Sequence, residues 1–163
     1  MNFVEKIFKA KESENWSEVK KDLIECKNIN ETYTAFGGWR LRSLIQLSAP
    51  VDTLKIALEQ GADPNFHIDN SNLPSLFYID GIQIDSIQLL IKYGANVNFQ
   101  VANGQTVFTL KPYRKIEFYK TIGENEYDFS LLDNQDNNIL HYAMHLINWD
   151  SSLAEYVLSL IHI

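Results

Sequence analysis

A sequence repeat of 33 residues constrains the fold of this chain more than any other feature. Residues 61–66 read Gly-Ala-Asp-Pro-Asn-Phe, and residues 94–99 read Gly-Ala-Asn-Val-Asn-Phe, 33 positions later. A stretch with helical spacing of apolar residues precedes each copy, at residues 54–60 and 87–93. Because glycine adopts the left-handed conformation after a helix without steric cost, each copy predicts a helix end. A period of this length is typical of stacked helical repeats.

The same motifs resemble the ankyrin repeat family, whose unit is a β-hairpin followed by an antiparallel helix pair. Gly104 and Thr106 match the family's Gly-x-Thr, and residues 138–143, Asn-Ile-Leu-His-Tyr-Ala, resemble its Thr-Pro-Leu-His-Leu-Ala. Asp133 stands five residues before Asn138, as the hairpin aspartate of the family does. The resemblance implies an all-α fold, an ankyrin-repeat solenoid of stacked helix pairs with β-hairpin-like connections.

The resemblance extends over nearly the whole chain of 163 residues, which we interpret as a single ankyrin-repeat domain. In this register Glu126 and Cys26 take the places of the helix-ending glycine. The inner helix of one unit is displaced to residues 75–79, and that of the next should end early at Lys111 and Pro112. The expected parts are an N-terminal helix pair (1–30) and units near 31–63, 64–96, 97–128 and 129–163.

The charge distribution limits the partners. The chain has 14 Lys and Arg against 21 Asp and Glu, a formal net charge of -7. Because phosphate-rich partners require clustered basic residues, we expect neither nucleic acid nor a membrane surface as partner. The net charge is carried by residues 121–163, which contain seven acidic residues and no Lys or Arg. A surface of one sign steers oppositely charged proteins, so we expect a basic protein partner.

Motifs for catalysis or cofactor binding are missing from the sequence. It has no Gly-x-Gly-x-x-Gly, P-loop or nucleophile-elbow motif, so we expect no enzyme, no catalytic residues and no cofactor. His141 and His145 have the i, i+4 spacing of metal ligands, but no Glu follows His141 as in zinc proteases, and we expect no metal site. The resemblance instead implies that His141 braces the neighbouring hairpin. The chain has a single cysteine, and its sequence shows neither a signal peptide nor a membrane-spanning run. We therefore expect a cytoplasmic protein.

Candidate binding residues follow from the resemblance, because ankyrin proteins usually bind partners with hairpin tips and the exposed side of inner helices. Trp39 and Tyr78 are interpreted equally well as core aromatics. The positions carried over are Trp39, Arg42, Asp69, Asn70, Asn72, Tyr78, Asp80, Asn103, Gln105, Tyr113, Arg114, Asn134, Gln135, Asn137 and His145. To these we add the acidic residues Glu124, Glu126, Asp128, Asp133 and Asp136.

These features predict a non-enzymatic protein-binding module. A short acidic chain of this kind resembles immunity proteins of bacterial toxin systems, which implies occlusion of a cognate basic toxin by carboxylates that imitate phosphate. Two alternatives stay open. One is an adaptor or effector that binds a host protein, and the other is a self-associating structural module that uses the apolar C-terminal helix, including Leu158 and Ile163.

Overall fold

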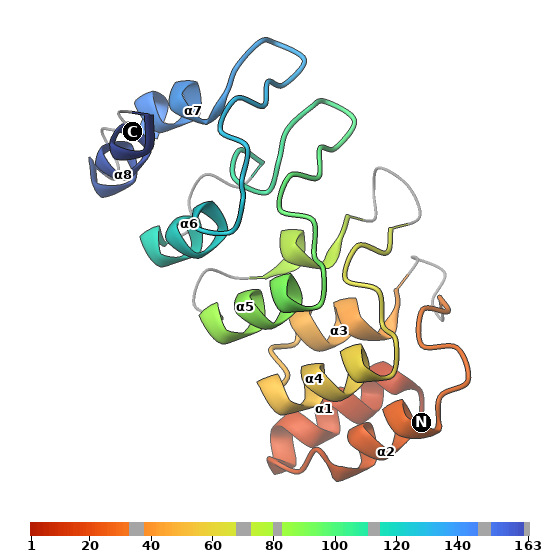
Figure 1. The fold of residues 1–163 in the computed structure, drawn as a ribbon. Coiled ribbons are helices and arrows are strands. Elements are labelled where there is room, and N and C mark those ends of the chain that lie inside the picture. Colours follow the sequence, from red (N-terminus) through yellow and green to blue (C-terminus); the bar gives the residue numbers. More distant parts are fainter. Residues whose placement is uncertain (33–37, 68–72, 80–82, 111–114, 147–150, 162–163) are drawn as a thin grey trace. The chain divides into compact units, whose positions relative to one another are not determined.

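The computed structural model describes residues 1–32, 38–67, 73–79, 83–110, 115–146 and 151–161. Within these ranges the chain has eight α-helices and one short 3₁₀ helix, whose order along the chain can be followed in Figure 1. No residue of these ranges belongs to a β-strand. The predicted all-α class is therefore confirmed, and it fits an ankyrin-like helical repeat fold. The predicted β-hairpin-like connections are not supported, because the described connections are turns and loops without paired strands. The chain forms two compact units, residues 1–79 with 88–95 and residues 80–87 with 96–163.

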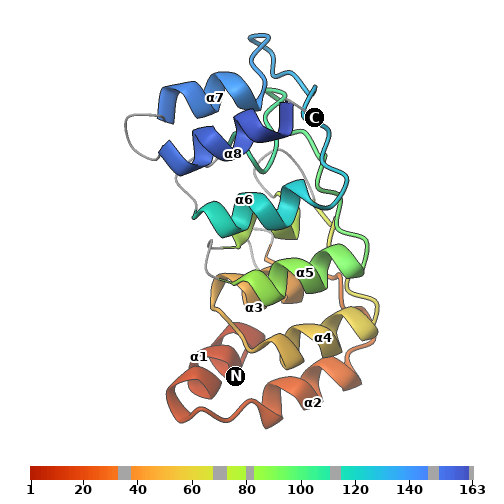
Figure 2. The same ribbon diagram turned by 60° about the vertical axis from the view of Figure 1, so that its left-hand side comes forward.

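The helices of the first unit pack in two rows. Its elements are α1 (Phe3–Ser13), α2 (Ser17–Glu25), α3 (Arg40–Gln46), α4 (Val51–Glu59) and the 3₁₀ helix η1 (Ser75–Tyr78). α3 contacts α1, α4 and η1, and α2 contacts α1 and α4. We call α1, α3 and η1 the inner row and α2 with α4 the outer row; Figure 2 shows α1 next to α3 and α2 next to α4. Apolar side chains between the rows form a core that includes Ile7, Leu23, Leu41, Leu44 and Leu54.

The helix ends of the repeat follow the glycines. Gly61 and Gly94 both have φ of 88°, which confirms the helix ends predicted there, and the next amide bonds back to the last helical turn. Glu126 has a left-handed φ of 60°, as its predicted place in the repeat requires. Cys26 follows α2 with an extended backbone, φ -70° and ψ 123°. The prediction that Cys26 takes the place of a left-handed glycine is therefore wrong for its conformation.

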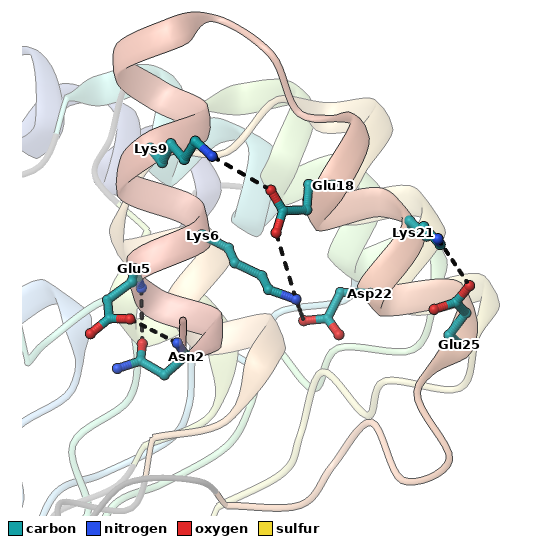
Figure 3. Close-up of polar contacts among 8 residues, drawn as sticks. All are labelled: Asn2, Glu5, Lys6, Lys9, Glu18, Lys21, Asp22 and Glu25. Carbon is teal, nitrogen blue, oxygen red and sulfur yellow. Dashed lines mark hydrogen bonds and ion pairs between the residues drawn. The ribbon is translucent and has the colours of Figure 1, made fainter.

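Polar contacts fix the N-terminal helix pair (Figure 3). α1 begins with a capping box, in which Asn2 Oδ1 accepts from the Glu5 amide at 2.9 Å and the Asn2 amide donates to Glu5 Oε2 at 2.8 Å. Lys6 of α1 then reaches across to α2, where its Nζ lies 3.5 Å from Asp22 Oδ2 and 3.9 Å from Glu18 Oε1. The charged residues of this pair thus connect its two helices as well as facing solvent.

The second unit is less regular. It contains α6 (Ile116–Gly123), α7 (Ile139–Leu146) and α8 (Ser151–Ile161), with α8 packed on both α6 and α7. α5 (Ile84–Lys92) has residues in both units. Residues 106–110 form turns where the inner helix of the third repeat was expected to begin, and Lys111 and Pro112 lie outside the described residues. Phe108 of this segment packs against two other aromatic rings. Its ring centroid lies 4.1 Å from that of Tyr127 and 5.3 Å from that of Tyr119.

Candidate functional site

Asparagine side chains connect successive repeat loops within each unit. In the first unit, Asn30 Nδ2 donates to the Gly61 carbonyl at 3.0 Å and Asn30 Oδ1 accepts from the Asp63 amide at 2.9 Å. In the second unit, Asn98 makes the same two bonds, to the Glu126 carbonyl at 3.0 Å and from the Asp128 amide at 2.8 Å. Each bridge satisfies backbone groups of the next loop and so sets the spacing between loops.

Two neighbouring loops of the second unit, residues 102–105 and 133–137, form what we call the loop pair. The Asn134 amide donates to the Asn103 carbonyl at 2.9 Å, and Asn134 Nδ2 donates to the Ala102 carbonyl at 3.1 Å. Gly104, with φ of 80°, permits this approach, since a Cβ there would lie 2.7 Å from Asp133 Cα. Only glycine fits at this position.

A chain of hydrogen bonds joins the loop pair to α7. Gln105 Nε2 donates to the Tyr142 hydroxyl at 2.7 Å, which donates in turn to Asp133 Oδ2 at 2.6 Å. Asp133 Oδ1 accepts from the amides of Gln135 and Asn137 at 2.8 and 2.9 Å. The Tyr142 hydrogen bond, supported by these amides against the opposing effect of burial, lowers the pKa of Asp133 to about 2. Burial and then Asp133 raise the pKa of Tyr142.

These bonds separate the predicted binding residues of the second unit into two groups. Asp133 is only 8% exposed, and Gln105 and Asn137 are half-buried. All three have structural contacts within the loop pair. The side chain of His145 lies outside the described part. The exposed residues are Asn103, Glu124, Glu126, Asp128, Asn134, Gln135 and Asp136. Among them the side chains of Asn103, Asn134 and Asp128 also make hydrogen bonds to Gln105, Ala102 and Ser130.

The inner row of the first unit has a groove between α1 and α3 that the sequence did not predict. It has a volume of about 240 Å³ and is lined by Val4, Phe8, Gly38, Arg42, Ser43, Gln46 and Leu47. Phe8 is 51% exposed at its edge. A signal for it exists in the sequence: Phe3, Ile7 and Ala10 are the buried stripe of α1, so Val4 and Phe8 form a second apolar stripe that the core does not use.

Arg42 connects the groove to an aromatic cluster. Its guanidinium carbon lies 4.3 Å from the ring centroid of Tyr78 and 5.3 Å from that of Trp39, and its Nε donates to Gln46 Oε1 at 3.3 Å. Trp39 is fully buried, with its ring edge-on to Phe66 at 5.3 Å. Trp39 is thus a core aromatic, and its ring packs against the Arg42 guanidinium. The prediction that Trp39 contacts a partner is therefore wrong. Arg42 and Tyr78 are half-buried and remain at the surface.

Some of the predictions cannot be placed. Asp69, Asn70, Asn72, Asp80, Tyr113 and Arg114 lie outside the described residues. Among the described residues, the His141 ring contacts Asn138 of its own repeat, whose amide donates to His141 Nδ1 at 3.2 Å. The structure therefore does not show the predicted brace to a neighbouring hairpin. In the described ranges no three His, Cys, Asp or Glu side chains are grouped as metal ligands. The helices of these ranges are also too short or too polar to cross a membrane.

Comparison with known proteins agrees with the fold. No protein-family model matches the chain. A protein of Acanthamoeba polyphaga mimivirus, which its name describes as an ankyrin repeat protein, is 32% identical over 113 residues, covering 56% of this chain and 20% of that protein. The chain thus corresponds to about a fifth of the length of this relative. The similarity and the all-helical structure together support an ankyrin-like family for this chain.

Proposed function

We propose that this chain is a non-enzymatic module that binds another protein. The similarity to an ankyrin repeat protein supports a protein-interaction module, and the asparagine bridges support repeats that stack into a solenoid. In this proposal the inner helices and the repeat loops form the binding face.

The observation that carries the proposal is the rigid loop pair. Its backbone and side-chain hydrogen bonds hold residues 102–105 and 133–137 in place, while Asn103, Asn134 and Gln135 remain exposed. A preformed loop loses little conformational entropy when it binds, so more of the contact energy becomes affinity. Each side-chain amide has two donor hydrogens and an oxygen that accepts two bonds, so Asn103 and Asn134 keep hydrogen-bonding capacity for a partner beside their bonds within the loop pair.

The charge of the second unit supports a basic partner. Glu124, Glu126, Asp128 and Asp136 are exposed, and residues 121–163 contain no Lys or Arg that would neutralise them. Such a surface raises the association rate of a basic protein, and the effect weakens as salt is added. Within this class of partner we propose a toxin whose basic active site the chain would occlude, so that the chain acts as an immunity protein in the cytoplasm.

Affinity capture from cells that make the protein, followed by mass spectrometry, tests the basic partner. The test variant carries Glu124→Gln, Glu126→Gln, Asp128→Asn and Asp136→Asn, and leaves the structural Asp133 in place. The control variant removes the same number of exposed charges from the first unit, through Glu14→Gln, Glu25→Gln, Glu31→Gln and Glu59→Gln. We expect wild type and control to capture the same basic protein and the test variant to bind it about tenfold more weakly at low salt. Equal binding by all three would refute a basic partner.

Co-expression tests the immunity proposal separately. The chain should restore growth of cells that make a toxin encoded next to its own gene, and the four-site test variant should protect less than the control variant. A chain that binds the neighbouring gene product without protecting the cell would remain a binding module but would not be an immunity protein.

Self-association is a second candidate function, because α7 and α8 expose Met144 at 52% and Leu158 at 36%. Light scattering on the purified chain should then show a dimer, which Leu158→Ser converts to a monomer. A monomer at all concentrations would exclude it.

A further inference from the structure

We propose that Asn103 is a site of spontaneous deamidation, that the closed loop pair protects it, and that the reaction, once it occurs, prevents the loop pair from closing. Asn103 is exposed and stands directly before Gly104. None of the other asparagines of the sequence precedes a glycine. The reaction itself depends only on the loop pair, whereas its effect on partner binding rests on the proposed function.

The reaction needs only the chain and water. The backbone nitrogen of Gly104 attacks Cγ of the Asn103 side chain and forms a C–N bond, and its proton leaves with the side-chain amide nitrogen as ammonia. Water then opens the resulting five-membered succinimide at one of its two carbonyls, which gives either aspartate or isoaspartate. A glycine in the following position favours the attack, because no Cβ crowds its nitrogen.

In the closed loop pair both reacting groups are held in hydrogen bonds. The Gly104 amide donates to the Val101 carbonyl at 2.8 Å. Asn103 Oδ1 accepts from the Gln105 amide at 3.1 Å, and Asn103 Nδ2 donates to Gln105 Oε1 at 2.7 Å. The Gly104 nitrogen has to lose its proton and the Asn103 amide has to release its nitrogen, so these bonds must break first. The rate should therefore follow the fraction of time for which the loop pair is open.

The fold itself requires the residue that makes Asn103 reactive. Gly104 has φ of 80°, and a Cβ at this position would lie 2.7 Å from Asp133 Cα. The neighbouring loop therefore excludes the larger residues that would slow the attack. The backbone carbonyl of Asn103 in turn accepts from the Asn134 amide at 2.9 Å. The reactive pair thus lies at the contact between the two loops.

The products do not fit the closed loop pair. Both lack the amide hydrogens that Asn103 donates to Gln105 Oε1, and aspartate places a carboxylate oxygen against it instead. Gln105 cannot turn its amide group around without losing the bond from its Nε2 to the Tyr142 hydroxyl. Isoaspartate also adds a carbon to the main chain, which displaces the carbonyl that accepts from Asn134. Because the ammonia is lost to solvent, deamidation opens this contact irreversibly.

Mass spectrometry of tryptic peptides follows the reaction over time in mildly alkaline buffer. Fragment spectra should place the mass gain of an amide that becomes an acid at Asn103, and not at Asn96 or Asn98 of the same peptide. The chain unfolded in urea should react at least about tenfold faster than the folded chain. Asp80 precedes Gly81 and can form isoaspartate too, but without a change of mass. Equal rates in the folded and unfolded chains would overturn the proposal.

A variant that opens the loop pair tests the protection. Tyr142→Phe removes the hydrogen bond to Asp133, and it should raise both the deamidation rate and the hydrogen exchange of the Gly104 amide about tenfold. Tyr93→Phe, in the first unit, is the control and should change neither. Faster exchange at Gly104 without faster deamidation would contradict the protective role of the closed loops.

A milder variant opens the loop pair from the other loop. Asn134→Ala removes the bond from Asn134 Nδ2 to the Ala102 carbonyl, and it should raise the same two rates by a smaller factor than Tyr142→Phe does. Gln135→Ala, at the neighbouring exposed position, is the matched control and should leave both rates unchanged. Equal acceleration by Gln135→Ala would mean that the contact between the loops does not control the reaction.

Asn103→Gln separates the consequence from the reaction. This variant keeps an amide but would have to form a six-membered ring, so it should stay unmodified under the same conditions. After incubation, the Asn134 amide of wild type should exchange faster in proportion to the modified fraction, and that of Asn103→Gln should not. Unchanged exchange in fully modified wild type would show that the loop pair tolerates the products, against the proposal.

None of these measurements uses a partner, so they stand apart from the proposed function. Affinity capture with fresh and incubated chain connects the two. We expect the modified chain to capture less of the basic protein than Asn103→Gln treated in the same way. If a modified chain with an open loop pair captured as much, only the proposed role of the loop pair in binding would be contradicted.

Discussion

The two units of this chain differ in their helices and in the residues that end them, but they connect successive repeat loops in the same way. The first unit is a regular two-row packing of helices, in which a left-handed glycine, Gly61, follows the end of α4. In the second unit a glutamate, Glu126, has the left-handed conformation, and turns replace part of a helix. Yet Asn30 and Asn98 make the same two bonds to the next loop in their respective units. The asparagine bridges are therefore present in both units, although a helix is partly replaced by turns in the second. This indicates that the bridges set the spacing between repeats.

The largest expected difference between the two units is in the stability lost when a glycine is replaced by alanine. Gly104→Ala in the second unit should destabilise the protein by about 3 kcal/mol, because it combines the left-handed φ with an overlap on Asp133 Cα. Gly61→Ala in the first unit has no atom within 4 Å of the added Cβ and should lose only the conformational cost, about 1–2 kcal/mol. Urea unfolding measures both, and hydrogen exchange shows which unit loosens. Equal losses would mean that the loop pair can separate at little cost.

The next effect concerns the buried carboxylate of the second unit. Tyr142→Phe removes the hydrogen bond to Asp133 and should lower the free energy of unfolding at neutral pH by about 2 kcal/mol, as for bonds to charged groups. Tyr93→Phe in the first unit, at another half-buried tyrosine, is the matched control and should have a smaller effect.

Acid unfolding extends this test. The folded pKa of Asp133, about 2, lies below the ordinary aspartate value, so its contribution is complete above about pH 4 and is lost as the pH falls towards 2. The difference in stability between wild type and Tyr142→Phe should therefore shrink over that range. A difference that stays constant down to the lowest pH would show that Asp133 does not carry the effect.

The asparagine bridges should behave alike in both units. Asn30→Ala and Asn98→Ala each remove two hydrogen bonds to backbone groups, so each should cost about 1–2 kcal/mol. Hydrogen exchange should increase at Asp63 in the first variant and at Asp128 in the second. Gln60→Ala, at an exposed side chain of the first unit, is the control. A bridge that matters in one unit alone would refute the idea that these side chains set the spacing in both.

The helix ends of the repeat could be predicted from the sequence, but the surfaces could not. The 33-residue spacing located Gly61 and Gly94 because a helix end is a local property of a glycine and the turn before it. Phe8 was missed because the register of α1 shows two apolar stripes, and only the position of α3 determines which of them is exposed. The burial of Trp39 likewise depends on Phe66 and Tyr78, which both come from the next predicted repeat, 64–96. The second apolar stripe of α1 is visible in the sequence, but which apolar residues are buried and which are exposed follows from tertiary packing.

The smallest effect concerns the ion pair between the outer helices of the first unit. Lys20 Nζ lies 2.7 Å from Asp52 Oδ2, and the hydrogen bond from Lys20 lowers the pKa of Asp52. Because the Asp52 side chain is 66% exposed, solvent weakens the attraction, and a double-mutant cycle with Lys20→Met and Asp52→Asn should give a coupling of about 0.5 kcal/mol at low salt.

Salt then distinguishes the two units. The Lys20–Asp52 coupling should vanish as the ionic strength rises towards about 1 M, since the Debye length falls to about 3 Å. The loss caused by Tyr142→Phe should persist in the same salt, because Asp133 is buried and is held by neutral donors at hydrogen-bond distance. If salt removed both effects equally, Asp133 would be as hydrated as Asp52, and the loop pair would not be held in place by a buried carboxylate.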